Sequence, residues 1–275
     1  MQCNVIYFFA PGFEKFIVDA TREAIPLMRN PEDAKEAEAY LRQEAQHSAA
    51  HVSHVRALSR RWPGLQETMK EVTASFDHLT ATKPLAWRLA YPAVVEATFT
   101  PYFKVFLDHE DKLFRPGDER VASLFIWHFV EEIEHRSSAL LVYDAVHGSY
   151  PYRVKTIGGV VKHVSKILCI ISSGFQRHVP KEDGGELARL GPNRLSVKAI
   201  RDVIKPSHEL AGRGTYVGVP RREVLGMLAG LVRSQGPNHD PKYEKLPELA
   251  GRWFKKYDEN PKIAARWYTV GSGVN

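Results

Sequence analysis

Apolar residues recur every three or four positions through most of the first 150 residues, whereas the alternation typical of strands is scarce. This spacing predicts amphipathic helices, and caps, prolines and glycines predict where they begin and end. The predicted helices cover residues 13–28, 31–59, 65–79, 84–109 and a last segment from the turn at 115–118 to Gly148. Long helices with short connections are typical of an antiparallel bundle, so we predict an all-α protein.

Several residues predict the helix boundaries. Asn30 followed by Pro31 is typical of an N-cap with proline in the first turn, and Gly148 is typical of the residue after a helix C-terminus. Pro92 and Pro101 lie inside the predicted segment 84–109, so we expect them to bend or interrupt it.

The last 125 residues are predicted to form a C-terminal helical extension (151–275) packed on a bundle core (1–150). A helix is expected over 152–178, and shorter helices near 194–204, 221–234 and 246–257. Segment 152–178 is interrupted by Lys155, Lys162 and Lys166, which argues against a membrane span. Its basic amphipathic character leaves peripheral membrane contact open, and the extension leaves a homodimer surface open.

Composition narrows the class of protein further. The formal net charge is +6, with no run of like charges and no nucleic-acid-binding motif, so we expect no nucleic-acid partner. Cys3 and Cys169 form no disulfide framework and have no metal-ligand spacing. The N-terminus lacks a signal-peptide pattern, and we therefore expect a cytoplasmic protein.

The stretch FIWHFVEEIEHRSSALLVYDAV, residues 125–146, places charged residues in an otherwise apolar helix. At about 100° per residue, His128, Glu132 and His135 fall within an arc of roughly 60°. Glu131 and Glu134 fall outside that arc. Three groups able to bind a metal therefore share one face of the predicted helix.

A second Glu-x-x-His motif lies in QEAQHSAAH, where Glu44 and His47 have the same spacing. His51 and His54 continue that stripe, although a supporting or surface role is the simpler interpretation for both. A di-iron carboxylate bundle needs two such motifs and one further Glu from each of two other helices. Glu14 and Glu96 precede the two motifs in the required order, and Glu23 is the alternative to Glu14.

The residue types match the chemistry of a dinuclear centre. Carboxylates can bridge two cations and imidazoles supply neutral ligands, so four glutamates balance the charge of two Fe ions. One Glu-x-x-His motif by itself is usually an ordinary solvated pair. Two motifs in apolar surroundings, each preceded by a glutamate, favour a centre of two Fe ions, with Mn or Zn as the less favoured metals.

The runs PGFEKF, RQEAQHSAAHVSHVRAL and WHFVEEIEHRSSALLVYDAVHGSY resemble a bacterial family of predicted metal-dependent hydrolases, over roughly residues 8–175. The family pattern is similar to GE-x-F, QEAQH and WH-x-x-EE-x-EH. The order of ligands also resembles ferritin-like di-iron proteins, which implies a ferritin-like antiparallel bundle. The spacing of His128, Glu132 and His135 further resembles p-aminobenzoate N-oxygenases, and this likeness implies that His128 is a seventh ligand.

Two classes of enzyme use such a centre. The sequence favours a non-haem di-iron oxidase or oxygenase, with Glu44, Glu132 and His128 as catalytic residues. Its partners would be O2, an external electron donor and a small organic substrate in an apolar pocket. The alternatives are a hydrolase with a metal-activated water, and a non-catalytic iron-binding or ferroxidase protein.

Overall fold

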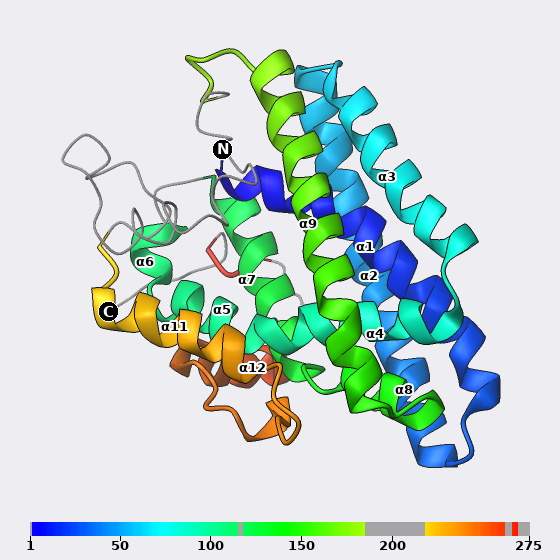
Figure 1. Ribbon diagram of the computed structural model, residues 1–275. Coiled ribbons are helices and arrows are strands. Elements are labelled where there is room, and N and C mark those ends of the chain that lie inside the picture. The colour runs from blue at the N-terminus through cyan, green and yellow to red at the C-terminus, as the bar shows by residue number, and fades with distance from the viewer. Residues whose placement is uncertain (1, 115–117, 185–217, 262–265, 269–275) are drawn as a thin grey trace. The chain divides into compact units, whose positions relative to one another are not determined.

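The computed structural model describes residues 2–114, 118–184, 218–261 and 266–268, and every regular element within these ranges is a helix (Figure 1). The predicted all-α class and helical bundle are thus confirmed. The chain forms two compact units, one from Met1–Val94 with Ser138–Ile200 and the other from Val95–Ser137 with Arg201–Asn275. The predicted division at residue 150 stays a prediction, and the expected helix at 194–204 lies outside the described residues.

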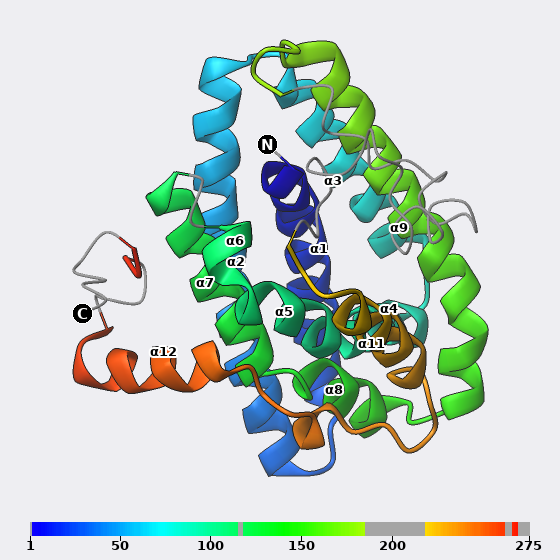
Figure 2. The same ribbon diagram turned by 90° about the vertical axis from the view of Figure 1, so that its left-hand side faces the viewer.

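Unit 1 is built around the helix α1, which packs against three other long helices. α1, α2, α3 and α9 alternate in direction as the chain passes from one to the next (Figures 1 and 2). The helices of this unit are α1 (Gln2–Ala24), α2 (Pro31–Arg61), α3 (Leu65–Thr82), α4 (Leu85–Val95), α8 (Ser138–Val146) and α9 (Tyr150–His178). A 3₁₀ turn, η1 (Ile25–Leu27), joins α1 to the α2 cap.

Unit 2 is organised around α5, which packs against α7, α11 and α12. Aromatic side chains form its interior, where the rings of Phe103 and Phe129 stack with centroids 4.0 Å apart. The elements of this unit are η2 (Glu96–Thr98), α5 (Phe99–Asp108), α6 (Glu110–Leu113), α7 (Glu119–Glu134), α11 (Arg221–Arg233), η5 (Pro241–Tyr243) and α12 (Glu248–Glu259).

Local signals account for the beginnings of α2 and α7. The Asn30 side chain accepts a hydrogen bond from Glu32 N, with Pro31 in the first turn, as the sequence predicted. Asp118 accepts from the backbone N–H groups of Arg120 and Val121 in the same way.

The first helix begins earlier than predicted, at Gln2, and runs through Pro11 and Gly12. Both residues are buried. The helix continues through them because its apolar side chains pack inside the unit. A Cβ at Gly12 would lie 2.7 Å from Cδ2 of Phe76, so this glycine allows α1 and α3 to approach closely. The Pro-Gly pair therefore serves packing and not chain reversal.

The predicted segment 84–109 is interrupted between its two prolines, at the 3₁₀ turn Glu96–Thr98. Pro101 cannot donate to the carbonyl oxygen of Ala97, four residues earlier, and its ring disfavours a continuous helix there. Pro101 instead occupies the first turn of α5, where a backbone donor is not needed. Glu96 consequently lies at an irregular turn.

The predicted continuous helix up to Gly148 is wrong, because α7 ends at Glu134 and α8 starts at Ser138. Arg136 Nη1 donates a hydrogen bond of 2.7 Å to the carbonyl oxygen of Ile133, an oxygen that a continuing helix would use for its own ladder. His135 becomes the C-cap residue of α7. This bond is a local side-chain interaction that helical periodicity does not reveal.

Among the described residues, no helix is long and apolar enough to cross a membrane. The segment 152–178 was expected to form a helix packed on the bundle, and α9 lies against α1 and α3 within unit 1.

Candidate metal centre

Unit 1 buries four of the candidate ligands on α1 and α2. Glu14, Glu44, His47 and His51 are each exposed by 2% or less. His47 Nδ1 lies 3.8 Å from Glu44 Oε1, and His51 Nε2 lies 3.4 Å from Glu14 Oε1. The i, i+3 spacing on α2 therefore brings His47 beside Glu44, whereas the packing of α1 against α2 brings His51 beside Glu14.

The two glutamates that competed for the role on α1 have different surroundings. Glu14 is 2% exposed, whereas Glu23 has a side chain that is 53% exposed and accepts a hydrogen bond of 2.5 Å from Arg88. Glu23 is therefore a partner of arginine near the surface.

His51 and His54 differ in the same way. His51 is fully buried, and its ring lies 4.5 Å from that of Tyr7. His54 is half-buried, and its Nε2 lies 3.1 Å from Asn4 Oδ1. The sequence placed His51 on the ligand stripe but did not reveal its contact with Glu14, because that contact joins two helices.

Unit 2 buries the other candidates, Glu96 on η2 and His128, Glu132 and His135 at α7. His128 Nε2 and Glu132 Oε1 are hydrogen-bonded at 2.8 Å, and His135 Nε2 lies 3.8 Å from Glu132 Oε2. One carboxylate thus lies between two imidazoles. No residue of the four is more than 6% exposed.

The neighbouring glutamates of α7 lie off this buried face, as helical geometry predicted. Glu134 is exposed, and Glu131 is half-buried and accepts a hydrogen bond of 2.6 Å from Trp127 Nε1. Their positions support the stripe predicted for His128, Glu132 and His135.

The donor chemistry of both units fits a metal ion. Isolated carboxylates are costly to bury unless they are paired, protonated or bound to metal, and each unit buries two glutamates. Glu14, Glu44 and Glu132 each lie beside a histidine of the same unit. Carboxylate oxygens and imidazole nitrogens are ligands for Fe, Mn and Zn. The groups that could hold a metal ion include Glu14, Glu44 and Glu132 with their histidines.

Comparison with known proteins gives one family. The sequence matches the family described as predicted metal-dependent hydrolases over residues 1–208. No curated protein and no solved structure matches the chain.

This match corrects the functional prediction. The expected O2-activating di-iron oxidase or oxygenase is wrong, because the family points to hydrolysis, and O2 and an electron donor lose their basis as partners. The sequence misled because glutamate and histidine ligands serve both redox and hydrolytic centres. The resemblance to the metal-dependent hydrolases is confirmed and the one to the N-oxygenases is not: the chain belongs to the family of predicted metal-dependent hydrolases.

Proposed function

We propose that this protein is a hydrolase with a dinuclear metal centre, in which water attacks an ester or phosphoester. The proposed ligands are Glu14, Glu44, His47, Glu96, Glu132 and His135, and His128 is hydrogen-bonded to the ligand Glu132. The observation that carries the proposal is the buried Glu-x-x-His pair of each unit, with 3.8 Å between imidazole nitrogen and carboxylate oxygen in both, in a chain of this family.

Charge balance supports a pair of divalent ions. The proposed ligands comprise four carboxylates and two neutral imidazoles, and four negative charges offset two divalent cations. When bound, such a pair lowers the pKa of a water molecule and polarises the carbonyl or phosphoryl oxygen of the substrate. The metal is Fe, Mn or Zn, and elemental analysis decides among them.

His128 and Glu132 form the proposed proton-transfer pair. Their hydrogen bond of 2.8 Å fixes the orientation of the imidazole, and both side chains are shielded from bulk water. A pair held in this way can accept the proton that the attacking water loses and return it to the leaving group. Glu131 takes no part, because its carboxylate is bonded to Trp127.

Metal analysis and hydrolysis assays test the proposal together. Protein freed of metal should regain about two ions per chain when Zn, Mn or anaerobic Fe(II) is supplied. At least one form should hydrolyse p-nitrophenyl butyrate or bis-p-nitrophenyl phosphate, and a chelator should abolish this activity. A chain that binds a single ion or none, or that cleaves neither substrate with any metal, would overturn the proposal.

Substitutions on α7 provide a matched comparison. Glu132→Gln should lower the metal content, whereas Glu134→Gln, an exposed residue on the same helix, should leave metal and activity unchanged. His128→Gln should retain most of the metal and lower the rate of hydrolysis by about 100-fold, the usual size of a proton-transfer contribution. Equal metal content in Glu132→Gln and Glu134→Gln would contradict the ligand assignment.

A small-molecule substrate is part of this proposal. Peripheral membrane contact, a homodimer, the absence of a nucleic-acid partner and a cytoplasmic location stay predictions from the sequence.

A further inference from the structure

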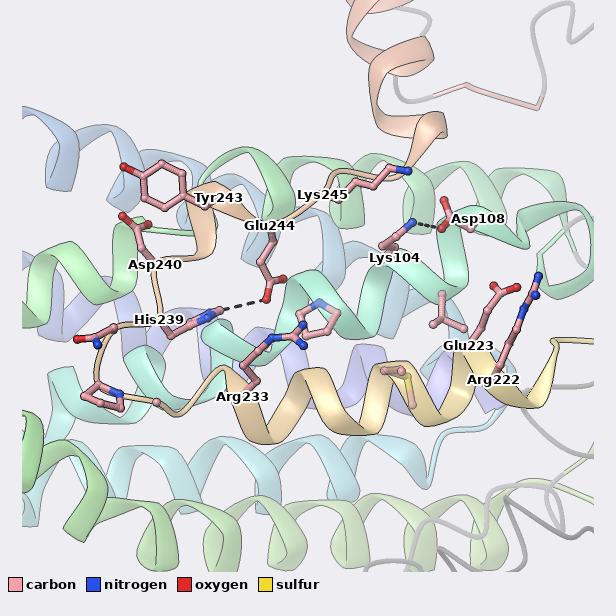
Figure 3. A pocket seen from close by; sticks show the side chains of 17 residues that line it. Lys104, Asp108, Arg222, Glu223, Arg233, His239, Asp240, Tyr243, Glu244 and Lys245 are labelled. Carbon is pink, nitrogen blue, oxygen red and sulfur yellow. Dashed lines mark hydrogen bonds and ion pairs between the residues drawn. The ribbon is translucent and has the colours of Figure 1, made fainter.

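A groove of about 1000 Å³ opens within unit 2, and none of the candidate metal ligands lines it (Figure 3). Its walls are α5, α11 and the segment 236–245, and all of its lining residues belong to this unit. This volume lies at the upper end of the range for small-molecule pockets.

The floor of the groove is apolar. Val105 and Met227, 6% and 5% exposed, belong to the packed interior of the unit, and Pro101 lies beside them. A Cβ at Gly230 would lie 2.6 Å from Pro101 Cβ, so close packing explains that glycine. Gly226 also lines the groove, but a Cβ there would meet nothing within 4 Å. Its missing side chain leaves space in the groove.

The acidic side chains of the groove have identified partners. Asp108 pairs with Lys104, Glu223 Oε2 lies 2.7 Å from His109 Nε2, and Asp240 Oδ2 lies 2.9 Å from Lys242 Nζ. In Glu244, Oε1 lies 4.0 Å from His239 Nε2, and burial raises the pKa of this carboxyl group. Two of these carboxylates are therefore paired with lysines, and the other two lie beside histidines.

The basic side chains are less well balanced. Within the described part of the chain, neither Arg222 nor Lys245 has a carboxylate within ion-pair distance, and Arg233 has only a longer-range interaction with Glu244. Arg233 points into the groove, and Arg222 and Lys245 lie at its edges (Figure 3). A ligand that carries one negative charge would complement these cations.

The segment 236–245, which forms one wall of the groove, is held in place by hydrogen bonds from the Arg136 side chain to backbone oxygens. Arg136 donates from Nε to Pro241 O at 2.9 Å and from Nη2 to Lys242 O at 2.8 Å. Asp240 also accepts from Lys242 N. A wall fixed in this way costs less conformational entropy when a ligand binds.

We propose that this groove binds a small amphiphilic carboxylate, with its apolar chain on the floor formed by Val105 and Met227 and its anionic group near Arg222, Arg233 and Lys245. The apolar floor, the space at Gly226 and the three cations that have no close carboxylate partner among the described residues support this ligand class. The proposal goes beyond the hydrolase function, because it concerns binding at a place that none of the proposed metal ligands lines.

A fluorescent fatty acid, 11-(dansylamino)undecanoate, tests the proposal with the full-length metal-loaded protein. It should bind with one site per chain and be displaced by decanoate. Decylammonium, with the same chain and the opposite charge, should compete at least about tenfold more weakly, as expected for the loss of a charge-assisted contact. Inorganic phosphate, which lacks an apolar body, should not compete. Equal competition by decanoate and decylammonium would overturn the proposal.

Two helix glycines provide matched variants for the site itself. Gly226→Leu should narrow the groove and weaken probe binding at least about tenfold, and its Cβ would meet nothing within 4 Å. Gly251→Leu on α12 is the control, because a Cβ there also meets nothing within 4 Å and Gly251 does not line the groove. Wild-type binding by Gly226→Leu would overturn the proposal.

The charges are tested in the same way. Arg222→Gln and Arg233→Gln should each weaken decanoate binding several-fold, whereas Arg221→Gln, the exposed neighbour outside the lining, should leave it unchanged. Circular dichroism shows whether each variant is folded. Because the readout is binding and not turnover, failure of this proposal is distinguishable from failure of the proposed hydrolase function.

Discussion

Protonation of His163 should destabilise unit 1 at mildly acidic pH. This histidine of α9 is 9% exposed, and its Nε2 lies 3.1 Å from Ser75 Oγ while its Nδ1 lies 2.9 Å from Tyr91 OH. Burial is the main cause that lowers its pKa from 6.5 to about 4, with a smaller contribution from the positive charge of Lys166. The neutral imidazole is therefore the form that the fold accommodates.

The sign and size of the effect follow from this shift. Because the pKa of His163 is lower in the folded than in the unfolded chain, the unfolded chain takes up a proton first as the pH falls below 6.5. The contribution of neutral His163 to the free energy of unfolding is complete above pH 6.5 and is lost progressively between pH 6.5 and about 4. By linkage, the loss should reach about 2 kcal/mol at pH 5.

Urea denaturation followed by circular dichroism at pH 7.5, 6 and 5 measures this loss. The variant His163→Gln keeps hydrogen-bonding groups but cannot be protonated, so its free energy of unfolding should fall less than that of the wild type. All other ionisable groups are the same in both proteins, and the difference between the two pH profiles removes their contribution. Parallel profiles from pH 7.5 to 5 would refute the argument that a buried neutral His163 controls this part of the pH dependence.

Three further substitutions test the metal ligands, the packing and a helix cap. Glu132→Ala should lower metal content and also the melting temperature relative to the loaded wild type, because a bound ion stabilises the folded state; equal melting temperatures of loaded and metal-free protein would contradict this. Gly174→Ala should lower the free energy of unfolding by about 1–3 kcal/mol, because the new Cβ on α9 would overlap the Thr68 side chain on α3. A higher melting temperature for this variant would contradict the prediction. Asn30→Ala should cost about 1 kcal/mol in urea titrations through loss of its cap to Glu32 N, and no change would show that the cap contributes little.

The amino-acid sequence alone was enough to predict the fold class and most helices. Amphipathic periodicity, the Asn30 cap and the turn before Glu119 are properties of a few consecutive residues, so they can be read without knowing the tertiary structure. The same reasoning placed His128, Glu132 and His135 on one face and excluded Glu134. Family membership could also be inferred, because the ligand motifs are short and contiguous.

Features that depend on contacts between distant segments were decided only by the tertiary structure. The break after Glu134 depends on the Arg136 side chain, and the burial of Glu14 and exposure of Glu23 depend on which face of α1 packs inside the unit. The contact between His51 and Glu14 joins two helices, and the groove of unit 2 is lined by α5 and segments more than 100 residues later. Periodicity reports which residues share a face of one helix, but burial and side-chain contacts depend on what that face packs against.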